Sequence, residues 1–270
     1  MIRTSYTYAA PDTLEEALSL VGQDGQQVLT GDQSLIGQLK QGIAQPQTLV
    51  SLRKIPGMAN IDATAGDVQL GALVTYADLS RHSALAGIPA LAEAVNTIQD
   101  PHLRNHSTIG GALYQGGPIH GPVLAVLAAL DAEAVLATQA GEKRVAITEL
   151  LQNGSSGLLT SGQLLKGVVV PLNQDVTCTY LPLEQLPGQH ARKGIAVGFR
   201  RTAEGQADQT RLVVAGFTPF PARFDGVDGS VSQLQLEQTM ATWLTTVPAG
   251  FQRHLIKVLI NRALSTIGVS

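Results

Sequence analysis

The chain has 270 residues, of which 44% are hydrophobic and 14% charged, and its formal net charge is −3. This globular composition gives no reason to expect nucleic acid or an anionic membrane as a partner. Cys178 is the only cysteine, which excludes an internal disulfide and any cysteine-rich metal centre within the chain. We expect no metal site from the scattered histidines. With no signal segment or membrane-spanning run, we expect a soluble, cytoplasmic protein.

The first 55 residues predict a small unit of alternating strands and helices. A capping pattern at Asp12–Glu15 precedes a helix with one apolar face. A short buried strand at 27–29, a helix at 34–41 closed by Gly42 and a strand at 48–52 follow. Strand and helix alternate here over a short span, as in a small α/β unit.

Residues 56–171 predict a larger mixed unit. Residues 68–73 alternate as a strand, and Thr75 can cap a short helix. Residues 104–113 are expected to form a loop. Further helices are expected at 88–95 and 122–130, and further strands at 135–136 and 164–170.

The C-terminal part predicts an antiparallel sheet followed by helices. Pro171–Asp175 is the expected boundary, because polar and turn-forming residues gather there. Polar turns separate the three strand candidates, which suits a meander, and two amphipathic helices close the chain. These elements are expected at 176–181, 194–200, 210–217, 234–244 and 251–267.

Two glycine-containing turns far apart in the sequence point to an anion. Thr30–Leu35 joins a buried strand to a helix, and Thr108–Gly111 has two adjacent glycines. Glycine lets the backbone approach a ligand closely, and the amides of such turns can point at one phosphate. Ser34 opens a helix whose N-terminus favours negative charge. Taken alone, the first turn is more typical of an ordinary strand-turn-helix capped by Ser34. The alternative for the second is a tight turn that packs Ile109 into the core, but its Arg104–Gly111 run favours a binding role, and the presence of both turns carries the inference.

The order of these pieces resembles the FAD-binding medium subunit of molybdenum hydroxylases, such as carbon monoxide dehydrogenase and xanthine dehydrogenase-like enzymes. The resemblance covers nearly the whole chain. Besides the two turns, it rests on Leu49–Gly57, Leu70–Thr75, Arg104–Asn105 and Leu127–Ala132. It implies an α+β fold with a two-lobed FAD-binding domain, a small α/β lobe beside a larger mixed lobe. A three-stranded antiparallel sheet with a helical bundle would follow.

The resemblance implies domain limits and cofactor contacts. The FAD-binding domain would span 1–171, with lobes of about 1–55 and 56–171, and the C-terminal domain 176–270. No catalytic acid or base is implied, and Arg104 and Asn105 would brace the second turn. The residues expected to hold FAD are Thr30, Gly31, Asp32, Gln33, Ser34, Leu35, Gly71, Thr75, Thr108, Ile109, Gly110, Gly111 and Ala112.

The resemblance also implies partners and a role in electron transfer. An iron–sulfur subunit with two [2Fe-2S] clusters and a molybdopterin subunit would accompany this chain, which would pass electrons to NAD or another acceptor. The lack of cysteine ligands fits clusters carried on another chain.

Several positions depart from the family's usual pattern. Asp32 replaces a glycine, Ala112 an asparagine and Gly121 an aspartate, and the family's lysine after Tyr180 is missing. A carboxylate at position 32 would repel a diphosphate. We take His120, which directly precedes Gly121, as a surface loop residue. A second hypothesis is therefore a degenerate paralogue without FAD, kept as a scaffold or assembly subunit. An unrelated α/β binding module that reuses glycine turns is a third.

Overall fold

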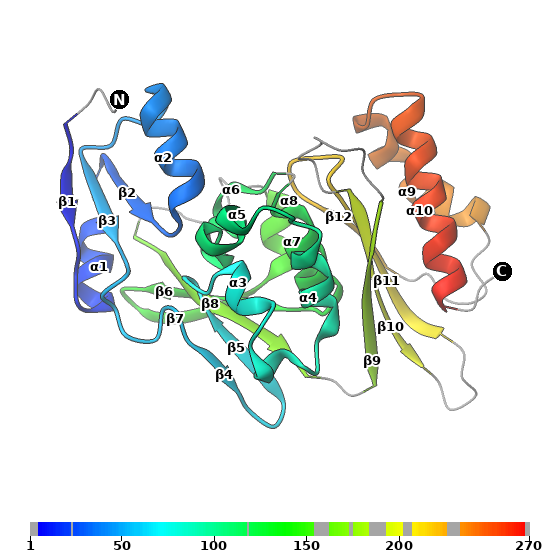
Figure 1. Ribbon diagram of the computed structural model, residues 1–270, viewed down its shortest axis with the longest axis horizontal. Coiled ribbons are helices and arrows are strands. Elements are labelled where there is room, and N and C mark those ends of the chain that lie inside the picture. Colours follow the sequence, from blue (N-terminus) through cyan, green and yellow to red (C-terminus); the bar gives the residue numbers. More distant parts are fainter. Residues whose placement is uncertain are drawn as a thin grey trace.

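The computed structural model describes residues 5–22, 24–117, 119–153, 162–172, 175–183, 193–201, 207–225 and 233–267. Three sheets follow one another across the molecule, from the N-terminal lobe to the C-terminal helices (Figure 1). The overall class is α+β, as predicted.

The N-terminal lobe is a three-stranded parallel sheet in the order β1-β3-β2. A helix lies on either side of it, and α2 packs its buried leucines on the sheet. The sequence did not predict the short edge strand β1. The elements are β1 (Thr7–Ala9), α1 (Leu14–Val21), β2 (Gln26–Leu29), α2 (Asp32–Gln41) and β3 (Thr48–Ser51).

The central unit is a five-stranded antiparallel sheet in the order β4-β5-β8-β6-β7. Its strands are β4 (Ile61–Ala63), β5 (Asp67–Gly71), β6 (Glu133–Thr138), β7 (Gly141–Ala146) and β8 (Leu164–Pro171). Its helices are α3 (Tyr76–Leu79), α4 (Pro89–Asn96), α5 (Pro101–His106), α6 (Ile109–Gln115), α7 (Gly121–Ala129) and α8 (Ile147–Asn153), with a 3-10 turn at Ser83–Leu85.

The loop predicted at 104–113 is wrong, because two short helices occupy most of it. Helix α5 starts with Pro101 after the cap Asp100, whose side chain accepts a hydrogen bond from the His102 amide at 2.8 Å. Helix α6 starts directly after Thr108 and contains the glycine pair. A capping threonine outweighed the low helix propensity of glycine here.

The C-terminal sheet has four strands, one more than predicted, in the antiparallel order β12-β11-β10-β9. The additional strand β12 is short and mixed in character, so it carries no period-2 signal of its own. Pairing with β11 and the ion pair of Arg223 with Asp131, at 2.6 Å, fix it in place. The elements are β9 (Val176–Pro182), β10 (Gly194–Arg201), β11 (Ala207–Ala215), β12 (Ala222–Asp225), α9 (Gln233–Thr246) and α10 (Phe251–Ile267).

Helix α7 joins the central unit to the C-terminal sheet. All of its residues are buried, so it has no polar face. Gly198 of β10 lets this helix approach, because a Cβ there would lie 2.5 Å from the Ala129 carbonyl oxygen. Residues of β10 alternate between two cores, with Ala196 toward α7 and Ile195 and Val197 toward α10. Within the described residues, no helix has the length and apolarity that crossing a membrane requires.

Candidate functional site

Three segments far apart in the sequence meet around the Thr108 side chain. Its hydroxyl donates a buried hydrogen bond of 2.8 Å to the Thr30 carbonyl oxygen. An isolated β-bridge joins Thr108 to Thr75. The fold therefore gathers the two predicted turns and the segment of the predicted contact Thr75 in one place, and we call the segment Ala72–Tyr76 the wall. We call these segments the cradle and define it as Thr30–Gly31, Ala72–Tyr76 and Ser107–Gly111.

Two glycines allow the cradle segments to lie this close. A Cβ on Gly31 would stand 3.1 Å from both the His106 carbonyl oxygen and the Thr108 Oγ1. A Cβ on Gly110 would stand 2.8 Å from the Ala72 carbonyl oxygen, closer than real Cβ contacts. Neither glycine has a positive φ, so close approach is the reason that these positions lack a side chain.

The first turn presents the N-terminus of α2. Gly31 is the N-cap and has no side chain with which to cap the helix. The first-turn amides of a helix have no intrahelical acceptor, so an anion is their natural partner. Leu35 is buried in the lobe, which limits it to a backbone contribution. The side chains of Asp32, Gln33 and Ser34 fall outside the described part of the structure.

The second turn uses its amides within the chain. The Ile109 amide donates to the Val74 carbonyl oxygen at 3.0 Å, and the Gly110 amide donates to that of Ala72 at 2.8 Å. The Gly111 amide donates to the Thr108 Oγ1 at 3.0 Å. The expectation that these glycine amides point at a diphosphate is therefore corrected. They fasten α6 to the wall, and the buried Ala112 packs into the core behind them.

Gly71 and Thr75 have local structural roles. A Cβ on Gly71 would collide with the Met58 carbonyl oxygen, where the preceding loop crosses the strand. Thr75 caps α3 in a capping box, with its hydroxyl donating to the Asp78 carboxylate at 2.5 Å. Thr75 nevertheless lies in the cradle, because its backbone pairs with Thr108.

His120 is buried, which corrects its reading as a surface residue. Its Nδ1 lies 2.7 Å from the Tyr76 hydroxyl, and burial lowers the pKa of His120 to about 4. The sequence signal was weak, because the residue sits between a Pro/Gly-rich turn and an apolar helix. The Tyr76 amide donates to the Ser107 carbonyl oxygen at 3.0 Å, so this pair stands directly behind the cradle wall.

Helix α5 carries two histidines at the rim of the cradle. His102 and His106 lie one turn apart, with ring centroids separated by 4.3 Å, so these two histidines are not scattered as we supposed. Arg104 Nη1 donates to the Ile98 carbonyl oxygen at 2.5 Å, which ties α5 to the segment before it rather than to the second turn. In the described ranges, no group of three or more potential metal ligands occurs.

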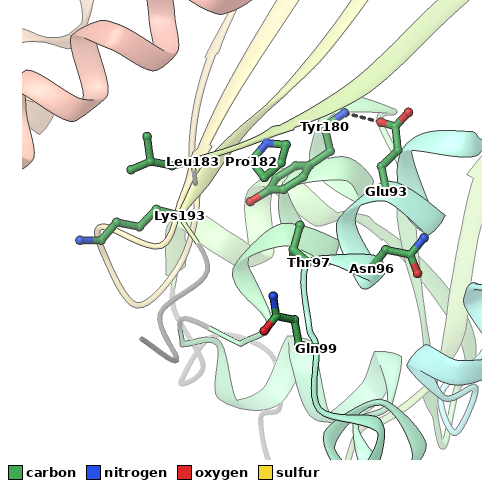
Figure 2. Close-up of a pocket in the computed structure, with 8 residues that line it drawn as sticks. All are labelled: Glu93, Asn96, Thr97, Gln99, Tyr180, Pro182, Leu183 and Lys193. Carbon is green, nitrogen blue, oxygen red and sulfur yellow. Dashed lines mark hydrogen bonds between the residues drawn. The ribbon is translucent and has the colours of Figure 1, made fainter. Parts of the chain in front are cut away.

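A cavity of about 490 Å³ lies between the end of α4, the end of β9 and Lys193, which directly precedes β10 (Figure 2). The Glu93 carboxylate accepts a hydrogen bond of 2.9 Å from the Tyr180 amide at its edge. The Tyr180 hydroxyl is buried with no hydrogen-bond partner among the described residues, and burial raises its pKa. The lining residues are Glu93, Asn96, Thr97, Gln99, Tyr180, Pro182, Leu183 and Lys193.

Lys193 lies at the edge of this cavity, with its ammonium turned away from Tyr180 and Gln99 (Figure 2), although the sequence lacks the expected lysine directly after Tyr180. Antiparallel pairing of β9 with β10 returns the chain to Leu183, whose amide donates to the Lys193 carbonyl oxygen at 2.9 Å. The Lys193 ammonium lies 5.2 Å from the centroid of the Phe217 ring, a cation–π contact. The hairpin register was the signal that could have placed this residue.

Residues 4–173 match the family described as the FAD binding domain in molybdopterin dehydrogenase. The chain belongs to this family. It is 31% identical over 217 residues to the 6-hydroxypseudooxynicotine dehydrogenase complex subunit alpha of Paenarthrobacter nicotinovorans, covering 78% of this chain and 73% of the relative. It is also 31% identical over 231 residues to the carbon monoxide dehydrogenase medium chain of Hydrogenophaga pseudoflava, covering 84% and 79%.

Solved structures of related proteins agree over nearly the full length. A carbon monoxide dehydrogenase structure from Hydrogenophaga pseudoflava, which lacks the Mo-pyranopterin moiety of the cofactor, superposes with a TM-score of 0.79 at 25% identity. It covers 99% of this chain and 98% of that one. A Cu,Mo-CO dehydrogenase at 23% identity shares the fold with a TM-score of 0.83, covering 99% of both chains.

This FAD-binding family member is an oxidoreductase flavoprotein subunit of the molybdenum hydroxylase type. Its residues fit the cofactor, because the uncapped N-terminus of α2 meets a glycine-lined turn. The degenerate scaffold is not favoured, since the family match spans both lobes and the cradle is assembled. The two relatives are named as a subunit of a dehydrogenase complex and as a medium chain of a dehydrogenase.

Proposed function

We propose that this chain is the electron-transfer subunit between an iron–sulfur partner and a final acceptor. The observation that carries the proposal is the cradle, where the Thr108 hydroxyl ties the second turn to the turn that opens α2. A partner with two [2Fe-2S] clusters, a molybdopterin subunit, NAD or another acceptor and a cytoplasmic location belong to the same proposal. We also propose the domains 1–171, with lobes of about 1–55 and 56–171, and 176–270, a division that the family match over 4–173 supports.

The FAD diphosphate would be held mainly by the amides that open α2. Gly31 leaves those amides uncapped, and a helix N-terminus carries about half a positive charge. Thr30 and Leu35 flank the contacting residues Asp32, Gln33 and Ser34. Among the other predicted contacts, Gly71, Thr75, Thr108, Ile109, Gly110, Gly111 and Ala112 would shape the wall and floor.

The cavity beside Tyr180 would hold the flavin ring. Its volume of about 490 Å³ lies in the range of small-molecule sites, which is about 300 to 1,000 Å³. Gln99 offers amide donors and acceptors there, and Lys193 offers a cation that would favour negative charge on a bound ring. Bound FAD would supply the redox chemistry, while these residues bind and orient it and tune its electrostatics.

An absorption spectrum of the purified chain tests FAD binding directly. The protein would be measured as isolated and after incubation with excess FAD and desalting. We expect retained flavin bands at about one FAD per chain, because the cradle is formed within this chain alone. Circular dichroism before and after desalting verifies that the protein is folded. A folded protein that stays colourless after both treatments would contradict the proposed site.

The partner proposal needs a separate measurement. The complex purified from its native source would be analysed for molybdenum, iron and flavin. We expect all three to co-elute with this chain. The ratio should be about four iron atoms for each FAD, because each of the two [2Fe-2S] clusters contains two iron atoms. Elution of the chain with flavin but without iron would argue against the electron-transfer role while leaving FAD binding intact.

A further inference from the structure

Helix α5 carries a histidine pair with the spacing of a metal chelate. His102 and His106 are four residues apart, so one helical turn brings their side chains to the same face. Their ring centroids lie 4.3 Å apart, and the ring planes are tilted by 43°. Two imidazoles on one zinc ion, each with a Zn–N bond of about 2.1 Å, hold their centroids roughly 5 Å apart. A small rotation of these two side chains therefore brings both rings onto one ion.

The backbone orients the His106 ring for coordination. Its Nδ1 lies 2.9 Å from the His102 carbonyl oxygen, and because that oxygen only accepts hydrogen bonds, Nδ1 carries the hydrogen. In the neutral ring, Nε2 is then left with a lone pair. Histidines that bind metals ordinarily donate their other ring nitrogen to a carbonyl or carboxylate oxygen, which fixes the tautomer and the ring orientation. His106 has this arrangement from the chain's own groups.

The His102 ring is available as the second ligand. The residue is exposed, and within the described ranges its hydrogen bonds involve its backbone and not its ring nitrogens. The cation on the same helix, Arg104, is engaged by the preceding segment, because its Nη1 donates to the carbonyl oxygens of Ile98 and Gln99. An approaching metal ion therefore meets two imidazoles that no other side chain occupies.

The spacing and the neighbours limit what this pair can do. Zinc proteases place two histidines at the same spacing on a helix, with a glutamate general base directly after the first. Leu103 stands at that position here, so the pair can bind a metal but has no such base. The described part of the chain adds no third side-chain ligand, which leaves the remaining coordination positions to water. Imidazoles suit Zn²⁺ and Cu²⁺, whereas Mg²⁺ prefers oxygen ligands.

We propose that His102 and His106 form a binding site for a divalent transition-metal ion of the zinc and copper class. The inference is independent of the proposed FAD site. The ion cross-links one turn of a six-residue helix, and helices this short have little stability of their own. Because α5 ends at Ser107 and α6 starts directly after Thr108, the ion stabilises the helix that leads into the cradle.

The test is a calorimetric titration of the full chain, prepared without a polyhistidine tag and treated with EDTA, with Zn²⁺, Cu²⁺ or Mg²⁺ alone. We expect one Zn²⁺ or Cu²⁺ to bind per chain, with Cu²⁺ bound more tightly, and no binding of Mg²⁺. His102→Gln and His106→Gln should each weaken Cu²⁺ binding at least about tenfold, because one of two protein ligands is lost. The electron paramagnetic resonance spectrum of the copper-loaded wild type should show two nitrogen ligands.

His254→Gln is the matched control. His254 is an exposed histidine on α10 with no second histidine one turn away, so its loss should leave the Cu²⁺ affinity unchanged. Saturating Zn²⁺ should raise the thermal midpoint of the wild type by about 5 °C and leave those of the two α5 variants unchanged. Circular dichroism verifies that all variants are folded.

Three results would overturn this inference and leave the FAD site standing. The first is a wild-type protein that binds neither Zn²⁺ nor Cu²⁺. The second is wild-type affinity in either α5 variant, which would place the metal elsewhere. The third is Mg²⁺ binding as tight as that of Zn²⁺, which would mean that oxygen ligands hold the ion.

Discussion

The two glycine turns look alike in sequence but act differently in the structure. The first turn ends at an N-cap without a side chain, so the opening amides of α2 are left for a ligand. In the second turn, the amides of Ile109, Gly110 and Gly111 donate hydrogen bonds within the chain, to the carbonyl oxygens of Val74 and Ala72 and to the Thr108 hydroxyl, respectively. We therefore propose that the first turn binds the diphosphate, whereas the second turn holds α6 in place. A glycine-rich sequence shows where backbone comes close, but not what it comes close to.

Substitution of Gly110 should produce the largest effect. A Cβ there would stand 2.8 Å from the Ala72 carbonyl oxygen. Because the Cβ is fixed to the helix backbone and the oxygen is itself backbone, α6 must move to relieve the contact. We expect Gly110→Ala to lower the free energy of unfolding by about 3 kcal/mol and to abolish FAD retention. Urea unfolding and desalting after FAD incubation measure the two effects.

Gly37→Ala is the control for this variant. It lies within α2 with open space around its Cα, so alanine there should slightly stabilise the protein. Equal stability of the two alanine variants would show that the second turn is not a tightly packed support.

Acid should lower the free energy of unfolding through His120, whose Nδ1 lies beside the Tyr76 hydroxyl behind the cradle. Burial lowers its pKa to about 4 from an ordinary value of 6.5, so the folded state favours the neutral ring. The stability that this group contributes is full above about pH 6.5 and is lost as the pH falls toward 4. The loss amounts to about 3 kcal/mol at most.

Urea unfolding at about pH 7 and pH 4.5 measures this loss, since the two values lie on either side of most of the titration. His120→Gln removes the titrating group, so its stability should fall less than that of the wild type over the same interval. Carboxylates contribute equally to both proteins. The same acid loss in both would mean that the buried histidine does not set the acid sensitivity.

Gly31 should show the smallest effect on stability. A Cβ at this position would stand 3.1 Å from the His106 carbonyl oxygen, a contact that a small shift of α2 relieves. We expect Gly31→Ala to cost about 1 kcal/mol of unfolding free energy, while weakening FAD about tenfold because the helix N-terminus moves. Fluorescence titration with FAD measures the affinity. Unchanged affinity would remove the first turn from the binding role.

Local signals in the sequence determined the long elements and the order of the pieces. The strand at 164–170, the helix after Pro122 and the capping role of Thr75 depend on periodicity and on residues close in the chain. The short elements β1, β4 and β12 carried too few residues for a period to show, and β7 is an edge strand whose residues are exposed except for Val145. Tertiary partners fix them, as β11 fixes β12.

Which polar groups are free for a ligand was decided only by tertiary structure. Gly110 packs against the Ala72 carbonyl oxygen, so its lack of a side chain serves close packing. His120 is buried against the Tyr76 hydroxyl, which the sequence around it did not indicate. Likewise, strand pairing puts Lys193 among the residues that line the cavity beside Tyr180. Sequence fixes the chemistry that each residue carries, whereas hydrogen-bond satisfaction and burial depend on neighbours that only the folded chain supplies.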